Sequence, residues 1–148
     1  MSLNGKIALI TGGAQGIGRF ISKELAGQGA HVILGDVNQD GAENTANEIK
    51  NIGGKASAVK IDVSNANDVK GVFDSILKDY KPIDIVVNNA GITRDGLLLR
   101  MKEIDWDLVL NINLKGSFLC SQQAIKQMIK QKSGAIVNIA SIVGVMGN

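Results

Sequence analysis

The chain has 148 residues, of which 45% are hydrophobic, 20% are charged and 18 are glycine. This composition is typical of one folded α/β domain, which we expect to span residues 1–148, and it excludes a disordered chain. The net charge of +2 gives no reason to expect nucleic acid as a partner, and no apolar run is long enough to span a membrane.

Two side-chain counts limit the chemistry and the compartment. The single cysteine, Cys120, excludes an internal disulfide and is consistent with a cytoplasmic protein, as is the lack of a secretory pattern at residues 1–6. Cys120 falls in a predicted helix, where a structural thiol is favoured over a nucleophile. The single histidine, His31, opens a predicted strand without a Ser or Cys partner, so we expect neither a histidine-based triad nor a metal site.

A glycine-rich loop at residues 11–18, TGGAQGIG, joins the first predicted strand to the first predicted helix. Residues 6–10 form a short apolar run suited to a buried parallel strand. Residues 19–29 have apolar side chains, including Phe20, at helical spacing. Such a junction presents backbone N–H groups at the positive end of the helix dipole, where a pyrophosphate can bind.

The glycines of this loop have separate predicted roles. Gly12 allows the tight turn, Gly16 lets the backbone approach the phosphates, and Gly18 lets the helix pack closely on the strand. We expect a cofactor to be held here by Gly12, Gln15, Gly16, Ile17 and Gly18. A glycine-rich turn without a ligand is the alternative, because the spacing is G-x-x-x-G-x-G and lacks the Gly-Lys-Ser/Thr of a P-loop.

An acidic residue supports the cofactor interpretation. The second apolar run, residues 31–35, ends in Asp36, about twenty residues past the loop, where a carboxylate can accept hydrogen bonds from ribose hydroxyls and would repel a 2′-phosphate. Gln15 agrees, since a basic residue would be expected there if a phosphate had to be neutralised. The sequence therefore predicts NAD(H) over NADP(H), with Asp36 and Val37 in the site. A helix-capping or solvated Asp36 is the alternative.

The rest of the chain continues to alternate between helices and strands. Predicted helices cover residues 40–51, 66–80 and 104–130, with a short helical turn at 97–100, and predicted strands cover residues 56–61, 83–87 and 135–139. Ser64 is the expected N-cap of the helix at 66–80. The apolar face of that helix is expected to consist of Val69, Val72, Phe73, Ile76 and Leu77.

This alternation indicates an α/β fold with a doubly wound, Rossmann-like parallel sheet that helices cover on both faces. Right-handed crossovers give the strand order 3-2-1-4-5. Ligands of such sheets bind at the carboxyl ends of the strands, where the order reverses between strands one and four. The residues singled out in each segment all lie at such ends: Gly12, Asp36, Asp62, Asn89 and Ser141.

Several motifs follow one another along the whole chain. They are residues 11–18, Asp62-Val63, Asn88-Asn89-Ala90-Gly91, Asn113 within NINLKG, and Ser141. In this order they resemble the motifs of the short-chain dehydrogenase/reductase family. Within that family, residues 92–101 and 141–148 are most similar to bacterial 3-oxoacyl-[acyl-carrier-protein] reductases.

The resemblance implies cofactor contacts for residues that follow the third and fourth strands. Asp62 would accept a hydrogen bond from the adenine, and Val63 would contact the adenine through its backbone. Asn89, Ala90 and Gly91 would line the cofactor ribose and support the sheet.

The resemblance also implies two catalytic residues. Ser141 would hydrogen-bond the substrate carbonyl or alcohol, and Asn113 would interrupt its helix and hold a water in a proton relay; an Asn113 satisfied by local backbone is the alternative. The acid of the family is a Tyr that a Lys follows four residues later, about a dozen residues after Ser141. Here the only tyrosine is Tyr80, and the residue four positions later is Asp84.

The printed sequence ends at Asn148, before such a motif. We therefore expect a partial view of a longer enzyme, with the sixth and seventh strands missing, and no turnover from these 148 residues alone; a truly truncated protein is the alternative. The implied reaction is hydride transfer between NAD(H) and a 3-oxoacyl or 3-hydroxyacyl thioester, as in fatty acid biosynthesis, in either direction. A non-catalytic dinucleotide-binding fragment and a short-chain dehydrogenase for a sugar, a steroid or a small alcohol are the alternatives.

The helix at 104–130 also bears on partners. It has apolar residues around much of its circumference, more than one sheet-facing side needs. The resemblance implies a homo-oligomer, a dimer or a tetramer, that uses this helix. Lys126, Lys130 and Lys132 at its end suggest docking of an acidic acyl carrier protein, but cations that complement the helix C-terminus are the favoured interpretation.

Overall fold

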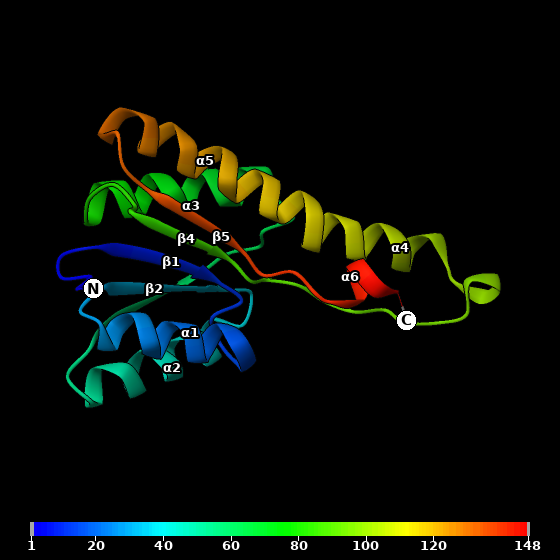
Figure 1. Ribbon diagram of the computed structural model, residues 1–148, viewed down its shortest axis with the longest axis horizontal. Helices are drawn as coiled ribbons and strands as arrows, with labels where there is room; N and C mark the ends of the chain where they lie inside the picture. Colours follow the sequence, from blue (N-terminus) through cyan, green and yellow to red (C-terminus); the bar gives the residue numbers. More distant parts are fainter. Residues whose placement is uncertain (1, 148) are drawn as a thin grey trace.

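The structure, a computed structural model, describes residues 2–147; Met1 and Asn148, the last residue of the family-like segment 141–148, lie outside the described residues. Its centre is a five-stranded parallel sheet in the order β3-β2-β1-β4-β5 (Figure 1). The strands are β1 (Ile7–Thr11), β2 (His31–Asp36), β3 (Lys55–Lys60), β4 (Ile85–Asn88) and β5 (Ala135–Asn138). The predicted doubly wound fold and its strand order are confirmed.

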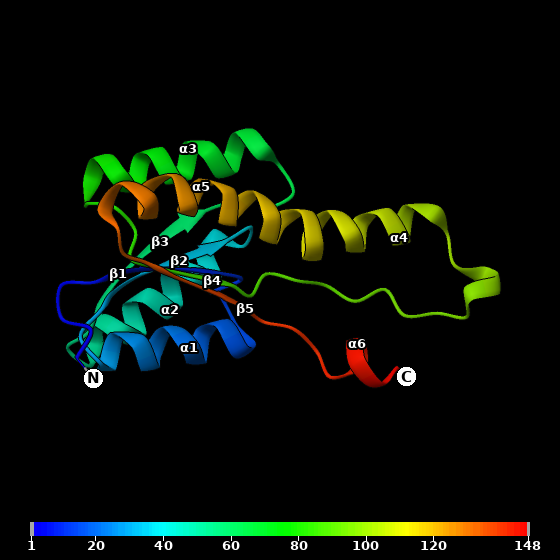
Figure 2. The same ribbon diagram turned by 45° about the horizontal axis from the view of Figure 1, so that its top comes forward.

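Helices cover both faces of this sheet. On one face lie α1 (Gly16–Gly27) and α2 (Gln39–Asn51), and on the other lie α3 (Ala66–Asp79) and α5 (Gly116–Gln131) (Figures 1 and 2). Successive strand residues point to opposite faces, so Leu9 belongs to the core beneath α3 and α5, whereas Ile10 belongs to the core beneath α1 and α2. Within residues 2–147, no helix is both long and apolar enough to cross a bilayer.

The sheet-facing side of α1 differs from the apolar face expected for it. Gly18, Ser22 and Ala26 are its buried residues, and their spacing of four places them in one line along the helix. Phe20 is 71% exposed instead. Because small side chains let the helix approach the strands closely, the larger apolar residues are left on the flanks.

Two details of α3 correct the sequence predictions. Its N-cap is Asn65, whose side chain accepts hydrogen bonds from two first-turn N–H groups. Ser64 does not cap the helix, because its N–H and its hydroxyl both donate to Asp62 Oδ1. Leu77 is 42% exposed, on the flank that faces the groove between α3 and α5, while Phe73 and the other predicted core residues are buried.

The predicted helix at 104–130 is present, but a π-helical turn divides it. Its segments are α4 (Glu103–Val109), the π-helical η2 (Leu110–Lys115) and α5, and the short helical turn predicted at 97–100 precedes it as η1 (Leu98–Arg100). The interruption implied for Asn113 is this turn, and such turns occur frequently at functional sites. Together with the short α6 (Val143–Met146), η1 and α4 extend beyond the carboxyl edge of the sheet (Figures 1 and 2).

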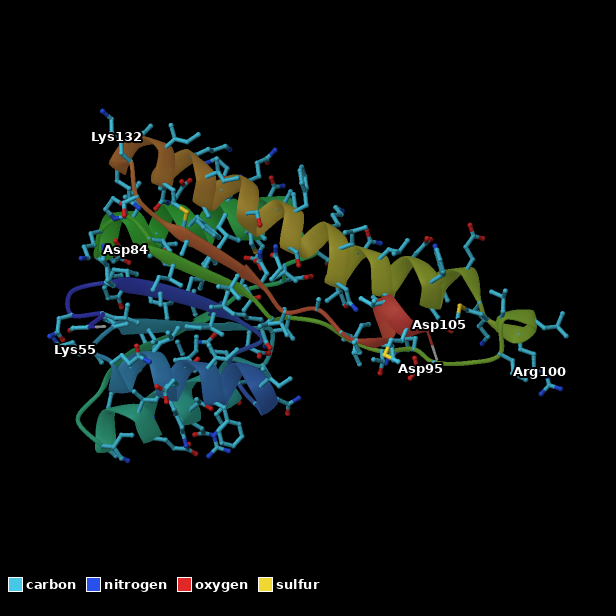
Figure 3. The ribbon with its side chains drawn as sticks, viewed as in Figure 1. Lys55, Asp84, Asp95, Arg100, Asp105 and Lys132 are labelled. Carbon is cyan, nitrogen blue, oxygen red and sulfur yellow. The ribbon has the colours of Figure 1, made fainter. Side chains whose placement is uncertain are left out.

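Asp84 joins the amino ends of β1 and β4. Its Oδ1 accepts a hydrogen bond from Lys6 Nζ at 2.8 Å, and its Oδ2 accepts one from the Ile7 N–H at 2.9 Å. The Asp84 side chain is 12% exposed. Figure 3 shows it at the same end of the sheet as Lys55, away from α4. One largely buried carboxylate thus supplements the backbone pairing of these two strands.

The same end of the sheet holds a polar cluster of His31, Ser57 and Tyr80. His31 Nε2 lies 2.9 Å from Ser57 Oγ, so the expectation that His31 has no serine partner is wrong, and the Tyr80 hydroxyl donates to that oxygen at 2.8 Å. The His31 and Tyr80 rings meet edge to face with their centroids 4.8 Å apart. Burial, and then the positive charges of Lys55 and Lys50, lower the pKa of His31. The only tyrosine of the sequence therefore lies away from the carboxyl ends of the strands.

Mild acidification is expected to destabilise the fold through His31. Because the pKa of His31 in the folded state lies below the ordinary value of 6.5, the unfolded chain binds more protons as the pH falls from about 7 toward the folded-state value. The free energy of unfolding is therefore highest above this pH window and falls as the pH decreases through it. His31→Gln is expected to remove this loss, as urea unfolding of both proteins at about pH 7.5 and 5.5 would measure.

The Glu48 carboxylate affects stability in a lower pH range than His31 does, so a measurement between pH 7.5 and 5.5 reports on His31. Hydrogen bonds from Lys23 and then Arg19 lower the pKa of Glu48 below 4.5, so its contribution is lost only below that value. An identical loss of stability between pH 7.5 and 5.5 in wild type and His31→Gln would contradict the assignment to His31.

Candidate cofactor-binding site

A cavity of about 540 Å³ lies at the carboxyl ends of β1, β2 and β4, where the strand order reverses. The predicted cofactor residues that line it are Gly12, Gln15, Gly16, Ile17, Asp36, Val37, Asp62, Val63, Asn89, Ala90 and Gly91. Further lining residues, which the sequence did not single out, are Gly35, Ile61, Ile92 and Ile112. A cavity with apolar walls and a few convergent polar groups is typical of a cofactor site.

The glycine loop forms one wall of this cavity. Gly12 and Gly16 have positive φ angles of 67° and 53°, a left-handed conformation that glycine adopts without steric cost. A Cβ on Gly18 would lie 2.1 Å from the Gly12 carbonyl oxygen, so Gly18 packs behind the loop and not in the lining. No side chain caps the start of α1 at Gly16, so the first-turn N–H groups can bind an anion.

Two backbone groups fix the Asp36 carboxylate at the cavity wall. Its Oδ2 accepts from the Ala14 N–H and its Oδ1 from the Asn38 N–H, each at 3.0 Å. The side chain that caps α2 is that of Asn38, so the capping alternative for Asp36 is wrong. Each carboxylate oxygen has a second acceptor position, so Asp36 can hold the loop and still accept from a ribose hydroxyl.

Asn89 supports the loop from the neighbouring strand. Its Nδ2 donates to the carbonyl oxygens of Thr11 and Gly12, at 3.0 and 3.1 Å. Thr11 Oγ1 accepts from the N–H groups of Asn89 and Ala90, at 3.1 and 3.0 Å, and donates to the Val87 carbonyl at 3.3 Å. Sequence reasoning missed this role of Thr11, for which the available signal was a hydroxyl residue between the first apolar run and the glycines of the loop.

Asp62 and Val63 are held at the next strand end. Asp62 Oδ1 accepts from the N–H and the hydroxyl of Ser64, at 2.9 and 2.7 Å, and the Asp62 N–H donates to Asp68 Oδ2 at 2.6 Å. A Cβ on Gly116 would lie 2.7 Å from Val63 Cγ2, so a glycine at the start of α5 lets that helix approach Val63. Asp68 and Gly116 were also missed, because no local pattern marks either contact.

The Asn113 side chain ties the π-helical turn to the loop that follows β4. Its Oδ1 accepts from the Ile92 N–H and its Nδ2 donates to the Ile92 carbonyl, both at 2.9 Å. The amide is therefore satisfied by backbone 21 residues away, and the alternative of a local partner is wrong. Ile92, the partner in this contact, and Ile112, which precedes Asn113, both line the cavity.

Ser141 lies outside the residues that line this cavity. It follows the end of β5, and its backbone carbonyl accepts from the Gly144 N–H at 3.1 Å as the chain enters α6. The structure thus brings together the predicted cofactor residues, while Ser141 follows the adjacent strand.

Two other predictions concern reactive side chains. Cys120 is fully buried, and burial raises the pKa of its thiol to about 12, which makes it the structural thiol expected from the sequence. Among the side chains of residues 2–147, no three His, Cys, Asp or Glu residues are grouped so that they would hold a metal ion.

Known proteins match the chain throughout its length. The family described as short chain dehydrogenase matches residues 6–148. The 3-oxoacyl-[acyl-carrier-protein] reductase FabG of Thermotoga maritima is 45% identical over 148 residues, which cover 100% of this chain and 60% of that protein. The protein of the same name from Staphylococcus aureus (strain Mu50) is 45% identical over 144 residues, which cover 97% of this chain and 58% of that protein.

A solved structure has the same fold. The crystal structure of a short-chain type dehydrogenase/reductase from Mycobacterium marinum matches with a TM-score of 0.96 at 35% sequence identity. The match covers 99% of this chain and 60% of that chain. The chain therefore spans about 60% of the length of the relatives that it matches.

Proposed function

Because this chain belongs to the short-chain dehydrogenase family, we propose that it carries the cofactor site of an oxidoreductase that transfers a hydride between NAD(H) and a 3-oxoacyl or 3-hydroxyacyl thioester. The names of the relatives support the thioester substrate, and such a reaction would serve fatty acid biosynthesis in the cytoplasm. One observation carries the preference for NAD(H): two N–H groups hold the Asp36 carboxylate at the cavity wall.

The residues present fit a dinucleotide. The N–H groups at the start of α1 would bind its pyrophosphate, and open space beside Gly16 lets a phosphate come close to the backbone. Asp36 would accept hydrogen bonds from the adenosine ribose, and Asp62 and Val63 would hold the adenine. When bound, the nicotinamide supplies or accepts the hydride.

On the substrate side we assign the two polar residues that the family pattern implies. The Ser141 hydroxyl would donate a hydrogen bond to the substrate oxygen. Asn113 would keep the π-helical turn and Ile92 in place beside the nicotinamide end of the cavity, consistent with its two hydrogen bonds to Ile92. Tyr80 is not the proton donor in this proposal, because it lies against His31 at the amino end of β2.

Cofactor selectivity tests the proposal. We expect NADH to bind at least about tenfold more tightly than NADPH, because a 2′-phosphate would meet the Asp36 carboxylate; a tenfold ratio corresponds to about 1.4 kcal/mol. Asp36→Asn should reduce this ratio, since it removes the negative charge. Fluorescence titration with both reduced cofactors measures the ratio.

A matched control separates a local from a general charge effect. Asp40→Asn removes a carboxylate from the exposed first turn of α2, outside the cavity lining, and should leave the NADH to NADPH ratio unchanged. Equal affinity of the wild-type protein for NADPH and NADH would refute the proposed preference.

The substrate carrier is a further part of the proposal, and either a small-molecule or an acyl-carrier-bound thioester suits the chemistry. Lys126, Lys130 and Lys132 lie at the end of α5. Lys126 donates to Gln123 at 3.1 Å, and Lys132 ends the helix in a left-handed conformation with a φ of 53°. Lys130 lies in the last turn of α5, a position that supports cations complementing the helix C-terminus over a preformed docking site.

We propose that the protein is a homo-oligomer, a dimer or a tetramer, which associates through α4, η2 and α5. Large apolar side chains are exposed along these segments: Ile104, Trp106, Leu108, Leu110, Leu114, Phe118, Ile125 and Ile129. Apolar patches of this extent mark interaction surfaces. The array continues from one end of the helical segment to the other, which suits antiparallel packing against a second copy.

Sedimentation velocity tests the oligomer. Leu114→Glu should shift the wild-type oligomer toward monomer, because a buried, unpaired carboxylate at an interface is strongly unfavourable. Lys78→Glu, which introduces a carboxylate and an even larger change of charge at an exposed position on α3, should leave the sedimentation coefficient unchanged. A monomeric wild-type protein would contradict this proposal.

A further inference from the structure

A buried amide lies between the two segments that carry the proposed catalytic residues. Asn88, the last residue of β4, is 3% exposed. Its Nδ2 donates to Asn138 Oδ1 at 2.8 Å and to Ser121 Oγ at 3.0 Å. Its Oδ1 has no hydrogen-bond partner among residues 2–147. A buried acceptor without a partner is unfavourable by about 1–3 kcal/mol, so stability alone does not favour an amide here.

The first contact fixes the end of β5. Asn88 and Asn138 are register partners on the last rung between β4 and β5. One residue after Asn138, the Ile139 N–H donates to the Asn88 carbonyl at 2.9 Å. Ser141 follows two residues later. Asn88 therefore holds the end of β5 through one side-chain hydrogen bond and one backbone hydrogen bond. Both bonds lie directly before the segment that carries Ser141.

The second contact fixes the start of α5. Ser121 lies on α5, one turn after Ser117, and Asn88 Nδ2 also lies 3.4 Å from the Ser117 carbonyl. The Ser117 hydroxyl donates to the backbone carbonyl of Asn113 at 2.8 Å. The same amide thus contacts the helix directly after the π-helical turn that carries Asn113.

We propose that Asn88 is a positioning residue for the reaction: its amide holds the end of β5 and the π-helical turn in one fixed arrangement, so that Ser141 keeps its position relative to the turn that carries Asn113. This inference rests on the proposed function. Asn88 is not among the residues that line the cavity; it acts through Asn138 and Ser117. A displacement of about 1 Å of a reacting group can lower a rate by about a hundredfold.

The test compares variants of the full-length enzyme. Asn88→Leu is expected to lower kcat by about 10- to 100-fold, while the KM for NADH stays within about twofold. The urea midpoint should change little, because the variant removes the unpaired buried oxygen together with the hydrogen bonds that the amide donates. Hydrogen exchange at the Ile139 amide should become faster, and exchange at the Leu9 amide in the sheet centre should not.

Two further variants keep the result interpretable. Asn138→Val removes the bond to β5 from the exposed side, and the double variant should lose no more kcat than Asn88→Leu alone, since Asn88→Leu already breaks that bond. Val87→Ile changes the preceding residue, which faces the other core, and should leave kcat unchanged.

The outcomes distinguish this inference from the proposed function. A wild-type enzyme that does not reduce 3-oxoacyl thioesters with NADH would overturn both. An active wild type with an unchanged kcat in Asn88→Leu and Asn138→Val would overturn the positioning role alone. A fall in kcat that matches an equal fall in folded fraction would also overturn it, because the amide would then have only a structural role.

Discussion

Gly18→Ala is expected to weaken NADH binding by about 10- to 100-fold, because the added methyl group has no space. A Cβ at this position would lie 2.1 Å from the Gly12 carbonyl oxygen and 2.6 Å from Asn89 Nδ2. Both neighbours belong to the wall of the cavity, and the nearest atom is backbone that cannot rotate away. Overpacking of this kind costs about 1–3 kcal/mol, and displacement of the loop would move the N–H groups proposed to bind the pyrophosphate.

Gly27→Ala is the matched control, since it adds the same methyl group to the other end of α1. A Cβ on Gly27 would meet nothing within 4 Å, and alanine is favoured over glycine in a helix by about 0.5–1 kcal/mol. We therefore expect unchanged NADH affinity and equal or higher stability for Gly27→Ala. Fluorescence titration and urea unfolding measure both quantities, and wild-type NADH affinity in Gly18→Ala would show that the loop yields without affecting the cofactor.

Asp84→Ala is expected to lower the free energy of unfolding by about 2–3 kcal/mol. The Ile7 N–H, in a strand whose five residues are all buried, would lose its acceptor, and an unpaired buried donor costs about 1–3 kcal/mol. The ion pair with Lys6 adds little, because the Lys6 side chain is 44% exposed and such pairs contribute about 0–1 kcal/mol. Urea unfolding at neutral pH measures the loss.

Asp84→Asn distinguishes the hydrogen bond from the charge. Its amide oxygen can still accept from the Ile7 N–H, so we expect a loss of only about 1 kcal/mol. Asp79→Ala, at an exposed position at the end of α3, should change the stability by less than about 0.5 kcal/mol. Equal losses in Asp84→Asn and Asp84→Ala would mean that the ion pair, and not the hydrogen bond to Ile7, holds this end of the sheet.

The sequence alone determined the sheet and the place of the site. Apolar runs such as residues 6–10 and 31–35 are the length of strands and alternate with helical patterns, so the parallel sheet and its strand order followed from general rules of handedness. Gly12, Asp36 and Asn89 lie within two residues of the ends of such runs, which placed them at one edge. Local spacing is sufficient for this, because every strand of a parallel sheet points the same way.

The tertiary structure decided how the groups at that edge are held. Thr11 and Asn89 are 78 residues apart in the sequence, and their mutual hydrogen bonds exist only because β1 and β4 are neighbours. Asn113 likewise finds its partner in a loop 21 residues away. Side-chain hydrogen bonds require distances near 3 Å and suitable angles, and no periodicity in the sequence encodes these for residues on different strands.

The tertiary structure also decided which of two similar neighbouring residues takes a given structural role. Ser64 and Asn65 are both good N-caps, and Asn65 takes that role because Asp62 already binds Ser64. For Asn88, the sequence showed an asparagine after a strand, whereas the fold placed its amide between β5 and α5. Composition and spacing thus determined which segments form this edge, and the packing of distant segments decided which polar atoms meet there, since each such contact depends on several strands and helices at once.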